Sequence, residues 1–113
     1  MKPILKLLKV SDNDYLKTHL TILNSILPTK LTDKEIEVLS EFMALEGTLA
    51  KDRFCTSGKK IVRLTLKLSS QGLYGHIKTL KEKGFITEDD KIISILFPSS
   101  QEEQTYQFKL IKE

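Results

Sequence analysis

The sequence predicts a small α+β protein with three or four helices, a C-terminal two-stranded β-hairpin and a short strand near the N-terminus as a further candidate element. Three observations carry this prediction. Apolar residues recur every three to four positions through most of residues 12–83, which is typical of helices that bury one face. Helix-capping residues precede several of these segments. After residue 86 the apolar residues follow a period of two, which is typical of strands.

Length and composition limit the class of protein. The 113 residues, 40% of them hydrophobic, leave room for one modest core. No apolar run approaches the roughly 18 to 20 residues that span a bilayer, and the first residues lack the apolar region of a secretory signal. Cys55 is the only cysteine, so the sequence offers no internal disulfide and no thiolate metal cage. We therefore expect an intracellular protein that does not contact membranes.

The first thirty residues contain an apolar arm and a helix. Residues 4–10 predict an edge strand or an arm, and Ser11 can cap a helix that ends at Pro28. One apolar stripe of that helix consists of Leu16, Leu20, Leu23 and Leu27, with Ile22 and Ile26 beside it. Because this stripe exceeds what one small core covers, a homodimer through residues 12–27 is a hypothesis. The prediction thus divides the chain into residues 1–30, an arm and helix, and residues 31–113.

Three more helices are predicted from local signals. Thr32 and Glu35 form a capping box at the start of a helix that stops near Gly47. After a loop over residues 47–57, Thr56 or Ser57 caps a short helix that reaches a tight turn near residue 68. Ser69 or Ser70 caps the helix at 70–83, whose inward residues are Leu73, Ile77 and Leu80.

The predicted hairpin follows these helices. Its strands are residues 92–97 and 105–112, and its tip is residues 98–104. Glu102 and Glu103 make that tip acidic, and it contains no lysine or arginine. An acidic tip repels phosphate, so we expect it either to point away from nucleic acid or to contact a protein partner.

The stretch IVRLTLKLSSQGLYGHIKTLKEKGFI, residues 61–86, resembles the winged helix-turn-helix domains of bacterial and phage DNA-binding proteins. The stretch covers about a quarter of the chain, and the capping-box helix and the hairpin, which would be the wing, extend the resemblance to about two thirds. The resemblance implies that the helix at 70–83 enters the major groove of double-stranded DNA. It also implies the cytoplasm of a bacterial or phage-infected cell.

The charge pattern supports a nucleic-acid partner independently. From Lys51 to Lys83 there are nine cations against two anions, a net charge of +7, whereas the rest of the chain carries nine cations and thirteen anions, or −4. Such a concentration is expected where phosphates dock, although a solvated lysine-rich face would look the same. The candidate DNA contacts are Lys59, Lys60, Arg63, Lys67, Ser69, Ser70, Gln71, Tyr74, Lys78, Thr79 and Lys81.

Two glycines inside the predicted helix at 70–83 need an explanation, because each costs roughly 1 kcal/mol relative to alanine. A helical wheel places Gly75 on the outward face with Gln71 and Lys78, and Gly72 at its edge. The glycines can allow close approach of DNA, allow close approach of a protein, or reflect a loose first turn.

No recognised pattern supports catalysis, and we expect neither a cofactor nor a bound metal, since His19 and His76 lack metal-ligand spacing. The sequence therefore predicts a small non-enzymatic DNA-binding protein, either a transcriptional regulator or a replication or mobile-element accessory factor. The alternative is a structural or assembly protein, such as a phage-particle component, which uses the same helices for protein contacts.

Overall fold

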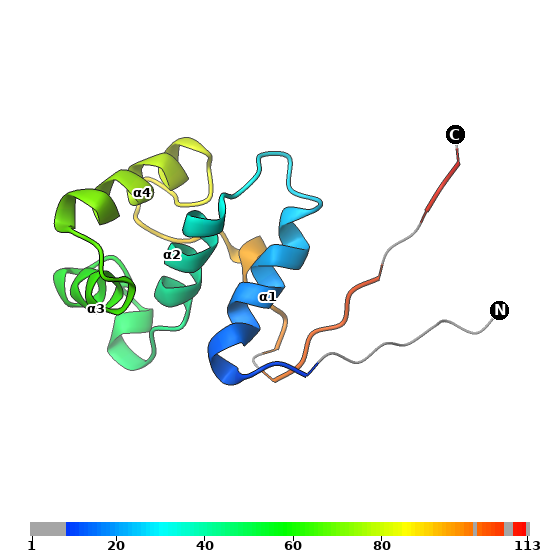
Figure 1. The fold of residues 1–113 in the computed structure, drawn as a ribbon, viewed down its shortest axis with the longest axis horizontal. Coiled ribbons are helices and arrows are strands. Elements are labelled where there is room, and N and C mark those ends of the chain that lie inside the picture. The colour runs from blue at the N-terminus through cyan, green and yellow to red at the C-terminus, as the bar shows by residue number, and fades with distance from the viewer. Residues whose placement is uncertain (1–8, 101, 108–109, 113) are drawn as a thin grey trace.

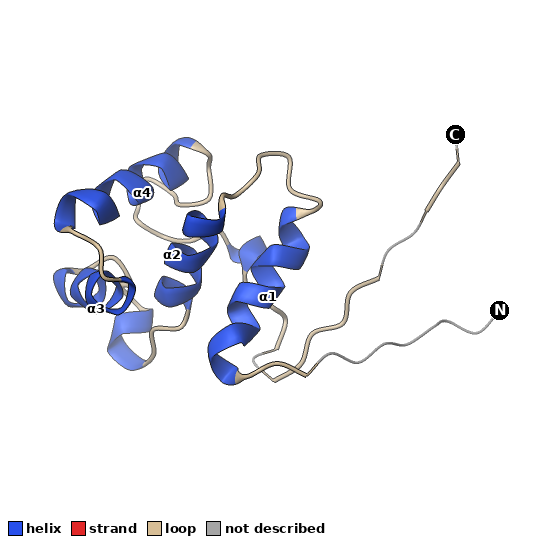
Figure 2. Cartoon of the chain, viewed as in Figure 1, coloured by secondary structure: helices blue, strands red, loops and turns tan. Residues whose placement is uncertain are grey.

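The computed structural model describes residues 9–100, 102–107 and 110–112, and the regular structure in these residues is helical (Figures 1 and 2). Four α-helices follow one another: α1 (Asp12–Asn24), α2 (Asp33–Met43), α3 (Thr56–Leu66) and α4 (Ser70–Glu82). Two short 3₁₀ helices, η1 (Gly47–Ala50) and η2 (Ser94–Leu96), lie in the connections. Figure 1 shows α3 and α4 at one end of the molecule, α1 toward the other, and α2 between them.

The helices α2 and α4 begin at the capping residues that the sequence predicts, whereas Ser11 precedes α1 without a side-chain cap hydrogen bond. Both hydrogen bonds of the capping box are present, from the Glu35 N–H to the Thr32 hydroxyl (3.2 Å) and from the Thr32 N–H to the Glu35 carboxylate (2.8 Å). The Ser69 hydroxyl accepts from the Gly72 N–H at 3.0 Å and caps α4. The cap of α3 is Cys55, whose Sγ accepts from the Gly58 N–H at 3.4 Å, rather than Thr56 or Ser57.

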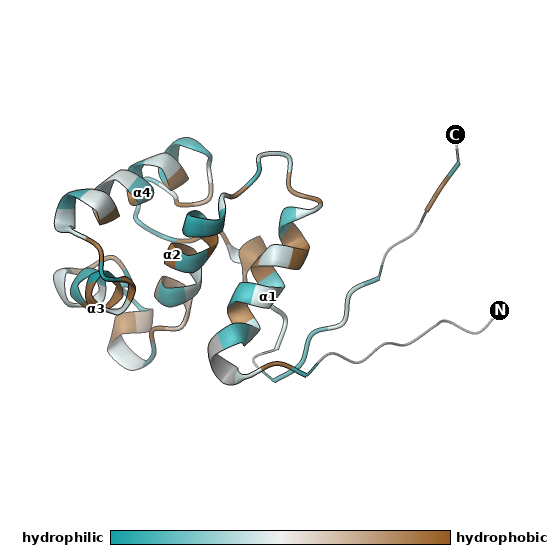
Figure 3. Cartoon of the chain, in the orientation of Figure 1, coloured by the Kyte–Doolittle hydropathy of each residue, from teal (hydrophilic) through white to brown (hydrophobic). Residues whose placement is uncertain are grey.

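All four helices contribute to one hydrophobic core. Each helix carries both hydrophobic and hydrophilic residues along its ribbon (Figure 3), as expected where one face is buried. The fully buried members come from α1, α2, α3, α4 and η2: Leu20, Val38, Leu39, Phe42, Val62, Leu80 and Leu96. Leu16, Leu23 and Leu27 pack against this core, so the leucine stripe of α1 is largely used inside the molecule.

The predicted α+β class and its C-terminal hairpin are wrong, because no β-strand occurs in the part of the chain that the structure describes. Ile92 forms a single antiparallel bridge with Ile86, and residues 94–96 coil into η2. The core-facing positions of this segment are 92, 93, 96 and 97, a helix-like spacing, whereas a strand would bury alternate residues. A run of consecutive apolar residues fits either period, which is why sequence alone misassigned it.

Residues 105–107 and 110–112 form no regular element, and residues 108–109 of the predicted second strand lie outside the described residues. Most of the predicted N-terminal strand, residues 4–8, also lies outside them. One residue of the predicted wing tip and one of the predicted second strand instead contact α1. The Tyr15 hydroxyl donates to the Ser100 carbonyl at 2.8 Å, and His19 Nδ1 is hydrogen-bonded to the Tyr106 hydroxyl.

None of the helices in the described ranges has both the length and the apolar character that crossing a membrane requires.

Candidate functional site

A three-residue turn joins α3 to α4. Lys67 ends α3 in the left-handed conformation (φ 56°), Leu68 follows, and Ser69 caps α4. The Leu68 N–H donates to the Arg63 carbonyl at 2.9 Å, which closes the last turn of α3. This short connection holds the two helices in one fixed arrangement.

The outward face of α4 carries the side chains that the helical wheel assigned to it. Gln71, Gly75 and Lys78 are exposed, and the Tyr74 side chain is 67% exposed. Leu73, Ile77 and Leu80 are buried on the opposite face. The surface offered by α4 is therefore an amide, a phenol and an ammonium group around a glycine.

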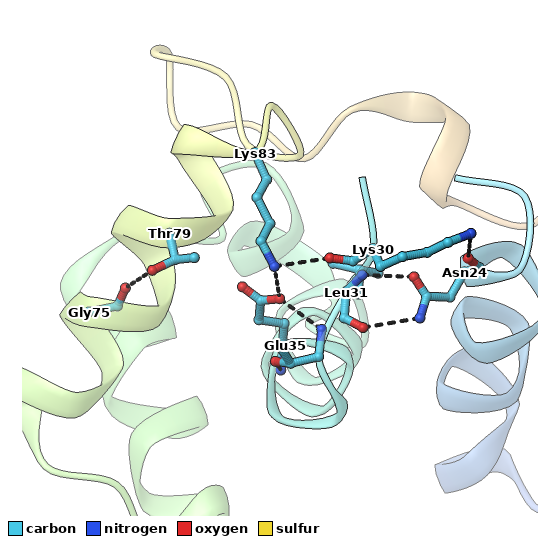
Figure 4. Close-up of polar contacts among 8 residues, drawn as sticks. Asn24, Lys30, Leu31, Glu35, Gly75, Thr79 and Lys83 are labelled. Atoms are coloured by element: carbon cyan, nitrogen blue, oxygen red, sulfur yellow. Dashed lines mark hydrogen bonds and ion pairs between the residues drawn. The ribbon is translucent and has the colours of Figure 1, made fainter. Parts of the chain in front are cut away.

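Two of the candidate polar contacts on α4 already make local hydrogen bonds. The Thr79 hydroxyl donates to the Gly75 carbonyl at 3.0 Å (Figure 4), and the Ser69 hydroxyl caps the helix. Ser70 is exposed beside the cap. Within α4, Gln71, Tyr74 and Lys78 are thus better placed than Thr79 or Ser69 to contact a ligand.

A groove of about 440 Å³ runs between α3 and α4. Its apolar floor consists of Phe54, Leu73 and Ile77, all buried. Its rim is mostly cationic and comprises Lys59, Lys60 and Arg63 on α3 and Lys81 on α4, together with Tyr74 and Asp90. The structure therefore brings four of the predicted contact cations to one concave surface.

The nine cations from Lys51 to Lys83 differ in whether they have a partner within the protein. Three have partners: Lys81 pairs with Asp90, Lys83 pairs with Glu35, and Arg53 donates to backbone carbonyls. The other six have no carboxylate within ion-pair distance as far as the described residues extend: Lys51, Lys59, Lys60, Arg63, Lys67 and Lys78. Five of these six lie on α3, on α4 or in the turn between them.

Lys83 forms contacts within the protein, which Figure 4 shows. Its Nζ lies 2.6 Å from Glu35 Oε1 and donates to the Lys30 carbonyl at 2.9 Å, so the end of α4 is tied to the start of α2. Burial alone would raise the pKa of Glu35, but hydrogen bonds from Lys83 and Thr32 and the positive charge of Lys83 outweigh it and lower that pKa.

Arg53 is a second structural cation. Its guanidinium donates to the carbonyls of Phe42, Met43 and Leu45 at 2.8 to 3.0 Å, which satisfies the C-terminal end of α2. It also lies over the Phe97 ring, 5.1 Å from the centroid. Burial lowers the pKa of this guanidinium. In the sequence Arg53 is recognisable only as part of the basic segment, because its acceptors are backbone groups that no sequence pattern identifies.

Three glycines in α3 and α4 differ in their surroundings. A Cβ on Gly58 would lie 2.1 Å from the Arg53 carbonyl oxygen, so α3 can pack against the preceding loop only with glycine there. A Cβ on Gly72 would lie 3.2 Å from the capping hydroxyl of Ser69. No heavy atom lies within 4 Å of the corresponding position on Gly75, among the described parts of the chain. Among these three glycines, Gly75 is therefore the one with open space at its Cβ position, and close approach at Gly72 and Gly75 stays a prediction.

Histidines and acidic groups do not assemble into a metal site where the structure describes them: no three His, Cys, Asp or Glu side chains come together. His76 is half-buried, and His19 is buried against Tyr106.

No family model, curated protein or solved structure matches this chain.

Proposed function

We propose that this protein binds double-stranded DNA, with the outward face of α4 in the major groove and the cations of α3 on the phosphate backbone. The observation that carries the proposal is a groove surface on which cations outnumber carboxylates, with Asp90 as the one carboxylate among the described lining residues. No aspartate or glutamate occurs between Arg53 and Lys81, and the groove there is lined by Lys59, Lys60 and Arg63. Such a surface attracts a polyanion.

The exposed face of α4 suits a major groove about 12 Å wide, which admits one helix. Gly75 keeps the centre of that face free of a side chain, so the backbone can come close to base edges. Gln71 can pair with adenine through two hydrogen bonds, and Lys78 can reach the acceptors of guanine. Both side chains are exposed on that face.

Lys67 supports the proposal in a different way. It adopts the left-handed conformation at the end of α3, where glycine is the residue with the least strain. A residue with a Cβ costs roughly 1 to 2 kcal/mol in that conformation. The presence of a lysine at this strained position is consistent with a use for its charge next to the DNA-facing surface.

The test is binding to mixed-sequence duplex DNA, measured by fluorescence anisotropy as a function of salt. Four or five phosphate contacts, from Lys59, Lys60, Arg63, Lys67 and Lys78, give a slope of log K against log salt of about −4. Absence of binding at about 50 mM salt would refute the proposal.

A pair of charge-reversal variants locates the surface. Lys60→Glu/Arg63→Glu should weaken binding at least about tenfold, because it replaces two phosphate contacts with repulsion. Lys9→Glu/Lys112→Glu makes the same change in net charge at exposed positions outside α3 and α4 and should have a much smaller effect. Equal effects of the two variants would mean that binding follows net charge and does not use the α3–α4 surface. Circular dichroism checks that both variants are folded.

A second candidate function, as a non-enzymatic assembly protein, is favoured by the exposed apolar residues of α3. The Leu64 side chain is 58% exposed, and Ile61 is also exposed. If the wild-type chain does not bind DNA, this α3 face becomes the surface to test for protein contacts.

A further inference from the structure

We propose that Asp90 limits the affinity of the α3–α4 surface for DNA by holding Lys81 in an internal ion pair. This inference rests on the proposed function and identifies Asp90 as the residue that limits the DNA affinity. The Asp90 carboxylate neutralises the Lys81 ammonium group, so DNA contacts are concentrated on α3 and on the N-terminal half of α4.

The ion pair lies at the groove itself. Lys81 Nζ is 2.5 Å from Asp90 Oδ1, and both residues line the groove between α3 and α4. The other rim cations, Lys59, Lys60 and Arg63, have no such partner in the described ranges. Asp90 is therefore the one carboxylate that lines this otherwise cationic surface, again within those ranges.

The position of Asp90 is set by a tight turn. The Thr87 N–H donates to the Lys91 carbonyl at 2.7 Å, and the Asp90 N–H donates to the Thr87 carbonyl at 3.0 Å. The Thr87 hydroxyl accepts from the Lys91 N–H at 3.2 Å. Asp90 itself is left-handed, with φ 59°, a conformation that aspartate and asparagine adopt more readily than most residues. The turn therefore presents this carboxylate toward α4.

The pair contributes little to the stability of the fold but reduces the affinity of the groove for DNA. Both side chains are more than a third exposed, and exposed ion pairs add little to stability. A phosphate that approaches Lys81, however, must displace Asp90 or remain beside it, and like charges at close range oppose binding. Removal of the carboxylate should therefore leave the fold intact and make one more phosphate contact available.

The experiment compares Asp90→Asn with Asp89→Asn by the same anisotropy assay. Asparagine keeps the left-handed conformation, and both variants remove one negative charge from the same turn. Asp89 is exposed and forms no ion pair that the described residues show. Asp90→Asn should tighten binding about three- to tenfold and make the salt slope more negative by about 0.9, the contribution of one phosphate. Asp89→Asn should tighten binding less and leave the slope unchanged.

Lys81→Ala completes a double-mutant cycle. In the wild-type background it should change DNA affinity less than about twofold, because Lys81 is already neutralised; in the Asp90→Asn background it should abolish the gain. Equal slopes for Asp90→Asn and Asp89→Asn, or a loss of affinity from Lys81→Ala alone as large as that from Lys59→Ala, would overturn this inference while the proposed function stands. Absence of DNA binding by the wild-type chain and by Asp90→Asn would refute the proposed function, and this inference with it.

Discussion

Replacement of Lys83 by methionine should destabilise the protein by about 2 to 3 kcal/mol. The methionine keeps most of the apolar stem of the side chain and removes the ammonium group that contacts Glu35 at 2.6 Å. Removing one member of a fully buried ion pair typically costs about 3 to 5 kcal/mol, because the remaining charge has no partner. The Glu35 side chain is 3% exposed, but that of Lys83 is 21% exposed, so water can partly replace the ammonium and reduce the cost.

The same variant has a predictable pH dependence. The folded-state pKa of Glu35 lies below its unfolded value, so the ionised carboxylate contributes stability above about pH 4.3, and this contribution is lost as pH falls through the folded-state pKa. Below that pH, Glu35 is protonated whether or not Lys83 is present. The difference in stability between wild type and Lys83→Met should therefore be smaller at about pH 3 than at pH 7.

Urea unfolding followed by circular dichroism measures both effects. With a slope of about 1.5 kcal/mol per molar urea, the midpoint at pH 7 should fall by about 1.3 to 2 M. The matched control is Lys34→Met, which removes an exposed partner of Glu37 (3.2 Å; side chains 42% and 38% exposed) and should cost less than about 0.5 kcal/mol. If the two variants are equally stable, or if the deficit of Lys83→Met is the same at pH 7 and about pH 3, the role assigned to this ion pair is wrong.

Three further predictions concern glycines and a histidine. Gly58→Ala should destabilise the protein by about 1 to 3 kcal/mol, because the new Cβ would lie 2.1 Å from the Arg53 carbonyl oxygen and force the backbone to move; a thermal melt with an unchanged midpoint would contradict this. Gly75→Ala should instead stabilise α4 by up to about 1 kcal/mol, because nothing described lies within 4 Å of the added methyl. The same methyl should weaken DNA binding if the helix backbone enters the groove, and unchanged binding by Gly75→Leu would exclude close approach there. Burial lowers the pKa of His19, so the folded state disfavours the imidazolium, and stability should decline as pH drops below about 6.5. His19→Asn should flatten the change in urea midpoint between pH 7.5 and 5.5, and an unaltered pH profile would show that another group titrates.

Local signals were sufficient to predict that the helices form and where α2 and α4 begin, but not the ends of α1 and α2, which lie at Asn24 and Met43. The predicted helix at 70–83 is observed as Ser70–Glu82, because its start is set by the Ser69 cap and its inward residues are spaced for a helix. The capping box at Thr32 is likewise a contact between residues three apart. Such features depend on near neighbours in the chain and are therefore visible in sequence.

The conformation of the segment predicted as a hairpin and the partners of individual cations depend on contacts between residues far apart in the sequence. Residues 92, 93, 96 and 97 face the core instead of alternating, and Ser100 and Tyr106 bind to α1. In the sequence Lys83 belongs to the basic segment, but in the structure it pairs with Glu35, 48 positions earlier in the chain. The net charge of the basic segment can therefore be counted from the sequence. Which of its cations lack an internal partner, and can bind a ligand, follows only from the structure.

The contacts of Ser100 and Tyr106 with α1 have a consequence for the order in which the chain folds during synthesis. The ribosome makes α1 before α2, α3 and α4, yet these two contacts join residues 85 and 87 positions apart. Contacts of such long separation form late, because most of the chain must be present before the loop between them can close. On a nascent chain, α2, α3 and α4 can pack together while Tyr15 and His19 still face water. Two contacts of α1 thus form only after Ser100 and Tyr106 have left the ribosome.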